Sequence, residues 1–182
     1  MRGGERAAAP EDGAWMRRAH TLAERGWGQT APNPMVGAVV VRDGAVVGVG
    51  WHTRYGDAHA EVEALRSAGD RARGATMFVT LEPCNHEGRT PPCTEAILAA
   101  GIRRVVVAVA DPNPAAAGGA DRLREGGVEV AIGLGEASAR ELNAPFFHAL
   151  TSDRPFVQLK LALSLDGAMS DQTRRQGWLT DH

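Results

Sequence analysis

A histidine, a glutamate and two cysteines in the middle of the chain have the residue types and spacing of a metal-dependent hydrolytic site. His59 and Glu61 lie two residues apart in HAEVEAL, and Cys84 and Cys93 bound the stretch CNHEGRTPPC. One imidazole and two thiolates form a three-ligand set for zinc that leaves one coordination place for water. Zinc lowers the pKa of bound water, and a nearby carboxylate can carry the proton. The pattern predicts His59, Cys84 and Cys93 as zinc ligands and Glu61 as the proton carrier.

These residues also have simpler interpretations. Two cysteines at this separation are, taken alone, more often ordinary buried residues than ligands, and His86 in the same stretch is a competing ligand. A structural zinc site normally closes with a fourth protein ligand, and Glu61 would then have no role. The order H-x-E, then P-C, then C is that of the zinc deaminases, in which hydroxide attacks a ring carbon bearing an amine. Hydrolytic deamination is therefore the favoured interpretation.

The flanking sequence predicts alternating helices and strands that would hold the four residues close together. Two β-branched runs surround Asp43-Gly44, which is a strong hairpin signal. The expected helices are 14–25, 59–69, 91–101, 120–125 and 137–150, and the expected strands are 36–42, 45–51, 75–81, 103–111 and 128–133. This order predicts a three-layer α/β/α sandwich around a mixed sheet. Cys93 would then open a helix, whose partial positive charge favours a thiolate there and also at Cys84.

Composition and charge narrow the class of partner. The 182 residues carry 20 Lys and Arg against 22 Asp and Glu, a formal net charge of −2, and only nine aromatic side chains (four Phe, four Trp, one Tyr). These values disfavour a nucleic-acid partner and favour a small molecule. No apolar run is long enough to span a membrane, and the opening MRGGERAAAPEDG lacks the apolar region of a secretory signal. Two cysteines are too few for the disulfide scaffold of a small secreted protein, so a cytoplasmic location is expected. The sequence leaves association into a homo-oligomer open.

Composition also predicts the domain boundaries. Residues 1–12 are expected to be a mobile N-terminus, 13–150 the deaminase domain, and 151–155 a polar linker containing proline. Beyond it, FVQLKLALSLDG (156–167) is predicted to be a strand that opens a second α/β unit. The segment 156–182 has too few residues for a core of its own and is interpreted as the truncated start of that unit.

Several longer stretches resemble one family, the bifunctional deaminase/reductase of riboflavin biosynthesis. The resemblance rests on PNPMVGAVVV (32–41), GWH (50–52), HAEVEAL (59–65), TLEPCNHEGRTPPC (80–93) and DPNPAAAGG (111–119). Eight residues separate the cysteines, whereas cytidine and tRNA-adenosine deaminases have two. RPFVQLKLALSLDG (154–167) and GWLT (177–180) resemble the opening of the reductase domain. The resemblance implies a cytidine-deaminase-like fold with zinc as its metal.

The resemblance also implies a substrate, 2,5-diamino-6-ribosylamino-4(3H)-pyrimidinone 5′-phosphate, and a set of binding residues. The residues on substrate-pocket positions are Asn33, His52, Asp111 and Asn113. Asn33 and the DPNP stretch could instead be turns, and Arg89 could meet the phosphate or brace its loop. A different nucleoside or nucleobase deaminase and a non-catalytic zinc scaffold remain as alternatives.

In the reductase part, the resemblance places Ala162 and Trp178 at the nicotinamide cofactor. Gln176 stands where the family has a serine that contacts the substrate. The sequence ends at His182, before most of that domain. NADPH is therefore expected to bind only to full-length relatives.

Overall fold

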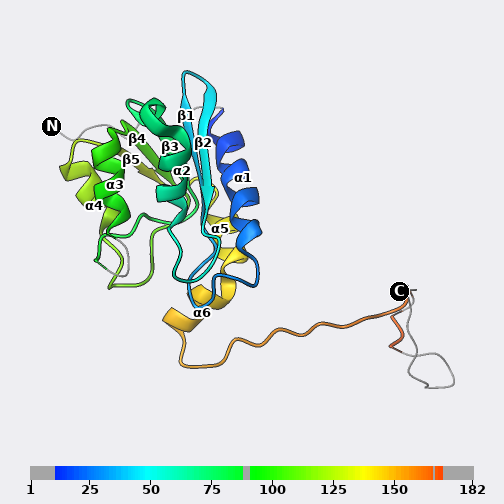
Figure 1. Cartoon of the computed structure of the whole chain (residues 1–182). Coiled ribbons are helices and arrows are strands. Elements are labelled where there is room, and N and C mark those ends of the chain that lie inside the picture. Colours follow the sequence, from blue (N-terminus) through cyan, green and yellow to red (C-terminus); the bar gives the residue numbers. More distant parts are fainter. Residues whose placement is uncertain (1–10, 88–90, 166, 170–182) are drawn as a thin grey trace.

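The computed structural model describes residues 11–87, 91–165 and 167–169, and it contains a five-stranded mixed sheet between two layers of helices (Figure 1). The strand order is β2-β1-β3-β4-β5. The β1–β2 and β1–β3 pairs are antiparallel, and the β3–β4 and β4–β5 pairs are parallel. The strands are β1 (Gly37–Arg42), β2 (Ala45–Trp51), β3 (Thr76–Val79), β4 (Arg104–Val107) and β5 (Glu129–Ile132). The predicted three-layer architecture is confirmed.

The β1–β2 hairpin turns at the predicted Asp43-Gly44 pair. Both residues have positive φ, 52° for Asp43 and 73° for Gly44. This pair of left-handed conformations is what a two-residue type I′ turn requires, and its twist matches that of the strands. The hairpin brings His52, directly after β2, to one end of the sheet.

Helices cover both faces of the sheet (Figure 1). One face carries α2 (Ala60–Ala68), α3 (Cys93–Ala100) and α4 (Gly119–Glu125), and the other carries α1 (Asp12–Ala23) with α5 (Glu136–Leu142). Gly50 of β2 lets α2 approach closely, because a Cβ there would overlap the carbonyl of Ala60. On the opposite face, Ala19 of α1 packs directly against Gly37. Two short 3₁₀ turns follow helices, Glu24–Gly26 and Gly69–Ala72.

The core lies along the two central strands. The side chains of Met77, Phe78 and Val79 in β3 and of Val105, Val106 and Val107 in β4 are at most 1% exposed. Strands covered on both faces are expected to be apolar throughout, and both are. Among the described residues, no helix is long and apolar enough to cross a membrane.

The prediction of a single helix over 137–150 is wrong. The structure has two helices there, α5 and α6 (Ala144–Thr151), which meet at Asn143. The Asn143 side chain binds the backbone of Met35, accepting from its N–H at 2.8 Å and donating to its carbonyl at 2.9 Å. Pro145, at the start of α6, has no N–H with which to continue a helix from α5. The break therefore anchors α6 beside the segment that enters β1.

The ends of the chain differ from the expected boundaries in two respects. Asp12 opens α1 and is buried beside Arg104, at 2.9 Å, so it does not belong to a mobile terminus. The strand predicted at 156–167 is absent from the described residues there, because no neighbouring strand pairs with them. They run away from the helices in extended form (Figure 1). Five apolar side chains in alternate positions are exposed, namely Val157, Leu159, Leu161, Leu163 and Leu165.

Candidate active site

Three separate elements bring the predicted metal ligands together. His59 has extended backbone geometry and immediately precedes α2, Cys84 lies in the loop after β3, and Cys93 is the first residue of α3, after Pro92. The Nδ1 atom of His59 is 3.3 Å from Cys93 Sγ and 3.5 Å from Cys84 Sγ. All three ligand atoms lie within 4.8 Å of one another.

This group fits a zinc ion. Tetrahedral zinc with Zn–S bonds of about 2.3 Å and Zn–N bonds of about 2.0 Å places its ligand atoms roughly 3.5 Å apart. The two N···S distances agree with that spacing, and neither cysteine is in a disulfide. His59, Cys84 and Cys93 could therefore hold zinc.

The charge distribution among these ligands differs from the expectation of two thiolates. A hydrogen bond from the Cys93 side chain lowers the pKa of Cys84 to about 4, helped by His59 and by the backbone N–H of Cys93, 3.4 Å from Cys84 Sγ. The same contact with Cys84, together with burial, raises the pKa of Cys93. The hydrogen bond to Cys84 also raises the pKa of His59. Without metal, the thiolate therefore resides on Cys84, because the hydrogen bond between the two sulfur atoms, helped by burial, keeps the proton on Cys93.

Glu61 lies in the first turn of α2 with its side chain in the interior. The residue is 3% exposed, and burial raises the pKa of its carboxyl to about 7. A carboxyl with a pKa near neutrality can both accept and donate a proton at physiological pH. Its position beside His59 places the predicted proton carrier next to the predicted metal ligands.

A cavity of about 300 Å³ opens at this end of the sheet. It brings together seven of the residues singled out from the sequence, namely Asn33, His52, His59, Glu61, Cys84, Asp111 and Asn113. Cys93 is fully buried behind them. His86 lines the cavity and is not one of the three clustered ligands. Ala162 is exposed in the extended segment and does not line the cavity, and Arg89, Gln176 and Trp178 lie outside the described residues.

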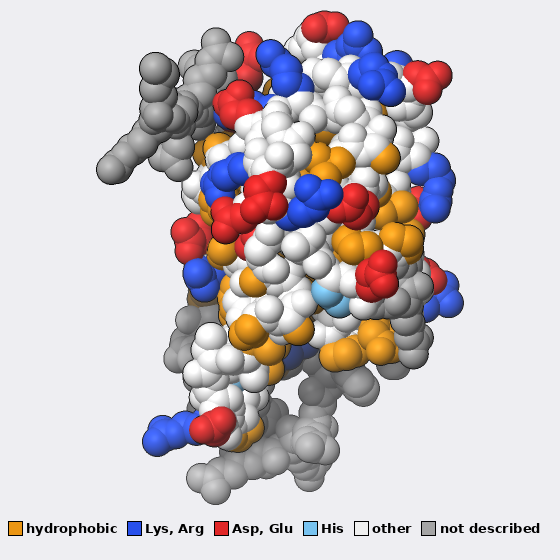
Figure 2. All heavy atoms as spheres, turned by 90° about the vertical axis from the view of Figure 1, so that its left-hand side faces the viewer, with side chains coloured by type: hydrophobic (Ala, Val, Ile, Leu, Met, Phe, Trp, Pro, Cys, Tyr) orange, Lys and Arg blue, Asp and Glu red, His pale blue; other side chains and the backbone are white. Residues whose placement is uncertain are grey.

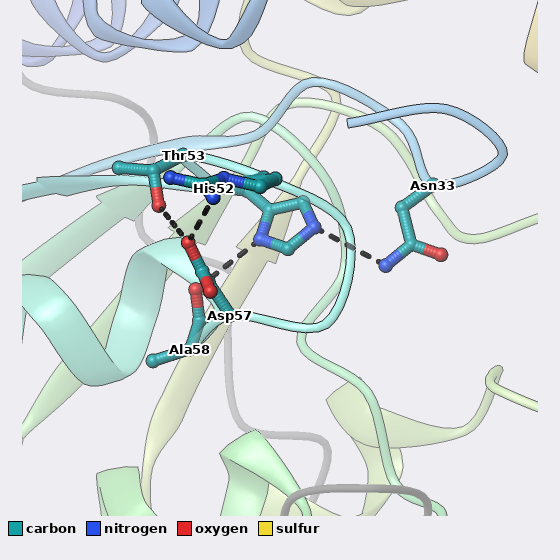
Figure 3. Close-up of polar contacts among 6 residues, drawn as sticks. Asn33, His52, Thr53, Asp57 and Ala58 are labelled. Carbon is teal, nitrogen blue, oxygen red and sulfur yellow. Dashed lines mark hydrogen bonds and ion pairs between the residues drawn. The ribbon is translucent and has the colours of Figure 1, made fainter. Parts of the chain in front are cut away.

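A chain of hydrogen bonds fixes the wall formed by His52 and Asn33 (Figure 3). His52 Nδ1 faces the carbonyl of Ala58 at 3.2 Å, so Nδ1 carries the hydrogen in this bond. Burial lowers the pKa of His52, which favours the neutral ring with Nε2 as an acceptor. Asn33 Nδ2 is 3.2 Å from this Nε2 and donates to it. The amide oxygen of Asn33 is thereby turned away from the ring, as an acceptor.

Asp111 and Asn113 form turns and line the cavity at the same time. Asp111 Oδ1 accepts from the N–H of Asn113 at 2.9 Å, and Asn113 Oδ1 accepts from the N–H of Ala115 at 3.1 Å. Burial raises the pKa of the Asp111 carboxyl. The turn interpretation and the pocket interpretation of DPNP are therefore compatible.

Sequence reasoning missed several residues that line the cavity. Among them are Tyr55 and Asp57 from the loop before α2, Glu82 from the loop after β3, and Phe146 from α6. The position of Glu82 in TLEPC, two residues before a ligand, was a usable signal. The sequence contains no such signal for Phe146, because only the break at Asn143 places α6 at this end of the sheet.

The chain resembles known proteins over most of its length. Residues 10–109 match the sequence model of the cytidine and deoxycytidylate deaminase zinc-binding region. The riboflavin biosynthesis protein RibD of Aquifex aeolicus is 52% identical over 170 residues, which is 93% of this chain and 48% of that protein. The solved structure of RibD from Acinetobacter baumannii, form 2, is 52% identical with a TM-score of 0.80, over 86% of this chain and 45% of that one.

A third relative is a Thermotoga maritima protein named as a diaminohydroxyphosphoribosylaminopyrimidine deaminase and 5-amino-6-(5-phosphoribosylamino)uracil reductase. Its structure matches with a TM-score of 0.86 and 44% identity, over 93% of this chain and 50% of that one. The present chain thus spans about half the length of the curated relatives it matches. The family match includes Glu61 and all three clustered ligands. The chain belongs to the cytidine and deoxycytidylate deaminase family of zinc-binding proteins.

Proposed function

We propose that this chain catalyses the hydrolytic deamination of 2,5-diamino-6-ribosylamino-4(3H)-pyrimidinone 5′-phosphate in riboflavin biosynthesis. Water replaces the ring amine by a carbonyl oxygen, so the products are 5-amino-6-ribosylaminouracil 5′-phosphate and ammonia. The observation that carries the proposal is the buried Glu61 carboxyl beside three clustered metal ligands, in one cavity with Asn33 and Asp111. The names of the RibD relatives support the choice of pathway.

In this proposal Glu61 moves the protons. Zinc held by His59, Cys84 and Cys93 would act as a Lewis acid that lowers the pKa of a water molecule. Glu61 accepts a proton from the attacking water and donates it to the nitrogen that leaves. Burial, which raises the pKa of this carboxyl, favours both transfers, since a group titrating near the working pH is competent in either direction.

The polar wall of the cavity supplies recognition. The amide oxygen of Asn33 is an acceptor, because its Nδ2 already donates to His52. Acceptors at Asn33 and Asp111, with the amide of Asn113, would pair with the amine and ring N–H groups of a diaminopyrimidinone. A ring that lacks these donors would cover these half-buried acceptors and leave them unpaired, which is a strong basis for rejection.

A small molecule fits this surface better than a nucleic acid. Arg side chains and carboxylates are interspersed on the face that Figure 2 shows. Among the described residues, several arginines form ion pairs, such as Arg122 with Glu95 at 2.8 Å and Arg124 with Asp121 at 2.9 Å. The described side chains on that face form no continuous basic path, which backbone phosphates would require (Figure 2). The two free cysteines also suit a reducing compartment, which supports a cytoplasmic location.

We assign deamination to residues 13–150, a linker to 151–155, and the opening of a reductase domain to 156–182. In this division NADPH contacts at Ala162 and Trp178 belong to the reductase domain of full-length relatives. Deamination requires neither residue, because the proposed ligands and proton carrier all precede residue 114.

The deciding experiment measures ammonia release and metal content together. The purified chain, loaded with one equivalent of zinc, is offered the diaminopyrimidine phosphate, cytidine, deoxycytidylate and guanine. We expect rapid ammonia release from the diaminopyrimidine phosphate alone. Preference for cytidine or deoxycytidylate would replace the proposed substrate, and release from none of the four would overturn the proposed activity.

A further inference from the structure

Glu82 is a buried carboxylate that is not one of the three proposed zinc ligands and carries no proton in the proposed reaction. It is 7% exposed, and both of its oxygens accept hydrogen bonds from the backbone. Oε2 accepts from the N–H of Asp111 at 3.1 Å, and Oε1 accepts from the N–H of Ala120 at 2.9 Å. One side chain therefore ties two points of the 111–120 segment to the loop that follows β3.

The N–H group of Ala120 needs such a partner. Ala120 is the second residue of α4, where a backbone N–H has no partner within the helix, and Gly118 before the helix offers no capping side chain. Asp111 begins the turns that line the cavity. A negative charge is also favoured beside the N-terminus of a helix.

Further contacts join the same two segments. The N–H of Asn85 donates to the carbonyl of Ala116 at 3.1 Å, and the carbonyl of Pro83 lies directly against Gly119. The backbone of Glu82 itself donates to the carbonyl of Val109 at 3.0 Å. The loop that carries Cys84 and the loop that carries Asp111 and Asn113 are thus packed as one unit, with the Glu82 carboxylate at its centre.

We propose that Glu82 is a positioning residue that sets the specificity of the pocket by holding Asp111 and Asn113 at the distance from the metal ligands that the pyrimidine edge requires. The proposal rests on the proposed function for its choice of substrate. A carboxylate is suited to this role because each oxygen can accept from a separate N–H group. Glutamine would have the same size but would direct an amide N–H₂ at one of the two donors.

The kinetic test compares Glu82→Gln with Glu95→Gln. Glu95 is a matched control, because it also ties α4 to a neighbouring element, through Arg122 at 2.8 Å, but on the surface. For Glu82→Gln we expect KM to rise about tenfold, as for loss of one charged hydrogen bond, with kcat within about threefold and zinc retained. Glu95→Gln should keep the KM of the parent chain. An unchanged KM in Glu82→Gln, or a loss confined to kcat, would overturn the proposal.

A double-mutant cycle separates positioning from direct contact. If Glu82 acts through the 111–120 segment, Glu82→Gln should raise KM much less in an Asn113→Ala background than in the parent chain. Additive effects would mean that Glu82 acts on the substrate directly or only on global stability, and would contradict the proposal.

A measurement that needs no substrate distinguishes failure of this proposal from failure of the proposed function. Amide hydrogen exchange of Asp111 and Ala120 should be slow in the parent chain and in Glu95→Gln, and at least tenfold faster in Glu82→Gln. If the parent chain deaminates nothing and exchange still follows this pattern, the proposed reaction is wrong, while the positioning role of Glu82 is supported. Equal exchange rates in all three proteins would contradict the positioning role of Glu82.

Discussion

The imidazole rings of His52 and His59 meet edge to face, with centroids 5.4 Å apart and planes at 85°. His52 follows β2 and His59 precedes α2, so this contact joins the end of the hairpin to a proposed metal ligand. Asn33 Nδ2 is hydrogen-bonded to Nε2 of the same His52 ring (Figure 3). The wall that would bind substrate and the group that would bind zinc are therefore packed against each other.

This arrangement predicts separable effects for Asn33 and His52. Asn33→Ala removes an acceptor from the pocket but leaves the two rings in contact. We expect its KM to rise about tenfold with zinc content unchanged. His52→Ala also removes the packing on His59, so zinc should dissociate faster in a chelator-competition assay. Zinc loss from Asn33→Ala comparable to that from His52→Ala would contradict this separation.

The metal ligands are tested by zinc content. Cys84→Ala or Cys93→Ala should lose most of the one zinc expected per chain, and the loop between the two cysteines should become more accessible to protease, because metal binding and local order are coupled. His86→Ala is the matched control, since His86 lies in the same loop and lines the cavity without belonging to the cluster. Full zinc retention in either cysteine variant would remove that residue from the ligand set.

Glu61 is tested by a change that keeps its shape. Glu61→Gln cannot carry a proton, so turnover should fall by at least about 10²-fold, while zinc and substrate binding persist. The control is Glu63→Gln on the same helix, where the carboxylate is paired with Arg66. Single-turnover ammonia release on zinc-loaded protein is the measurement. Turnover near that of the parent chain would remove Glu61 from the mechanism.

His20 predicts a loss of stability at mildly acidic pH. It lies in α1 against Gly135, and burial lowers its pKa below 6.5, partly opposed by the backbone of Gly135 and by Glu24. Below pH 6.5 the unfolded chain binds a proton at this site that the folded chain resists, so stability falls as pH decreases.

His20→Gln removes the difference in proton binding between the folded and the unfolded chain at this position. The decrease in Tm between pH 7 and pH 5.5, measured by circular dichroism, should be smaller in His20→Gln than in the parent chain. An equal or steeper decrease in the variant would show that other groups account for the pH dependence.

The extended segment after α6 should be dispensable for deamination. Removing residues 152–182 deletes seven exposed large apolar side chains of the described segment and no proposed ligand or proton carrier. Zinc content and ammonia release should therefore stay within about twofold, the scatter of such measurements, and solubility should improve. Removing residues 144–182 is the contrasting change, because it also deletes Phe146 from the cavity and the buried Phe147. This longer deletion should lose activity. Loss of deamination in the shorter deletion would move the domain boundary.

Local sequence was sufficient for the features that depend on near neighbours. The hairpin follows from Asp43-Gly44, whose backbone geometry is a property of those two residues. The candidate ligands follow from residue type and spacing, because few other roles require His, Glu and two Cys in this order. The helix boundaries near His59 and Cys93 follow from apolar periodicity and from the proline and glycine at the ends.

Only the tertiary structure decided the features that depend on residues far apart in the chain. The break at Asn143 requires Met35, which lies 108 positions earlier, and no local periodicity encodes that contact. The same holds for Glu82, whose partners lie 29 and 38 positions away, and for the pKa values of the two thiols, which depend on burial and on the distance between their sulfur atoms. Burial and hydrogen bonding across elements are properties of the packed chain, so sequence spacing identifies the reactive groups while packing sets their orientation and charge.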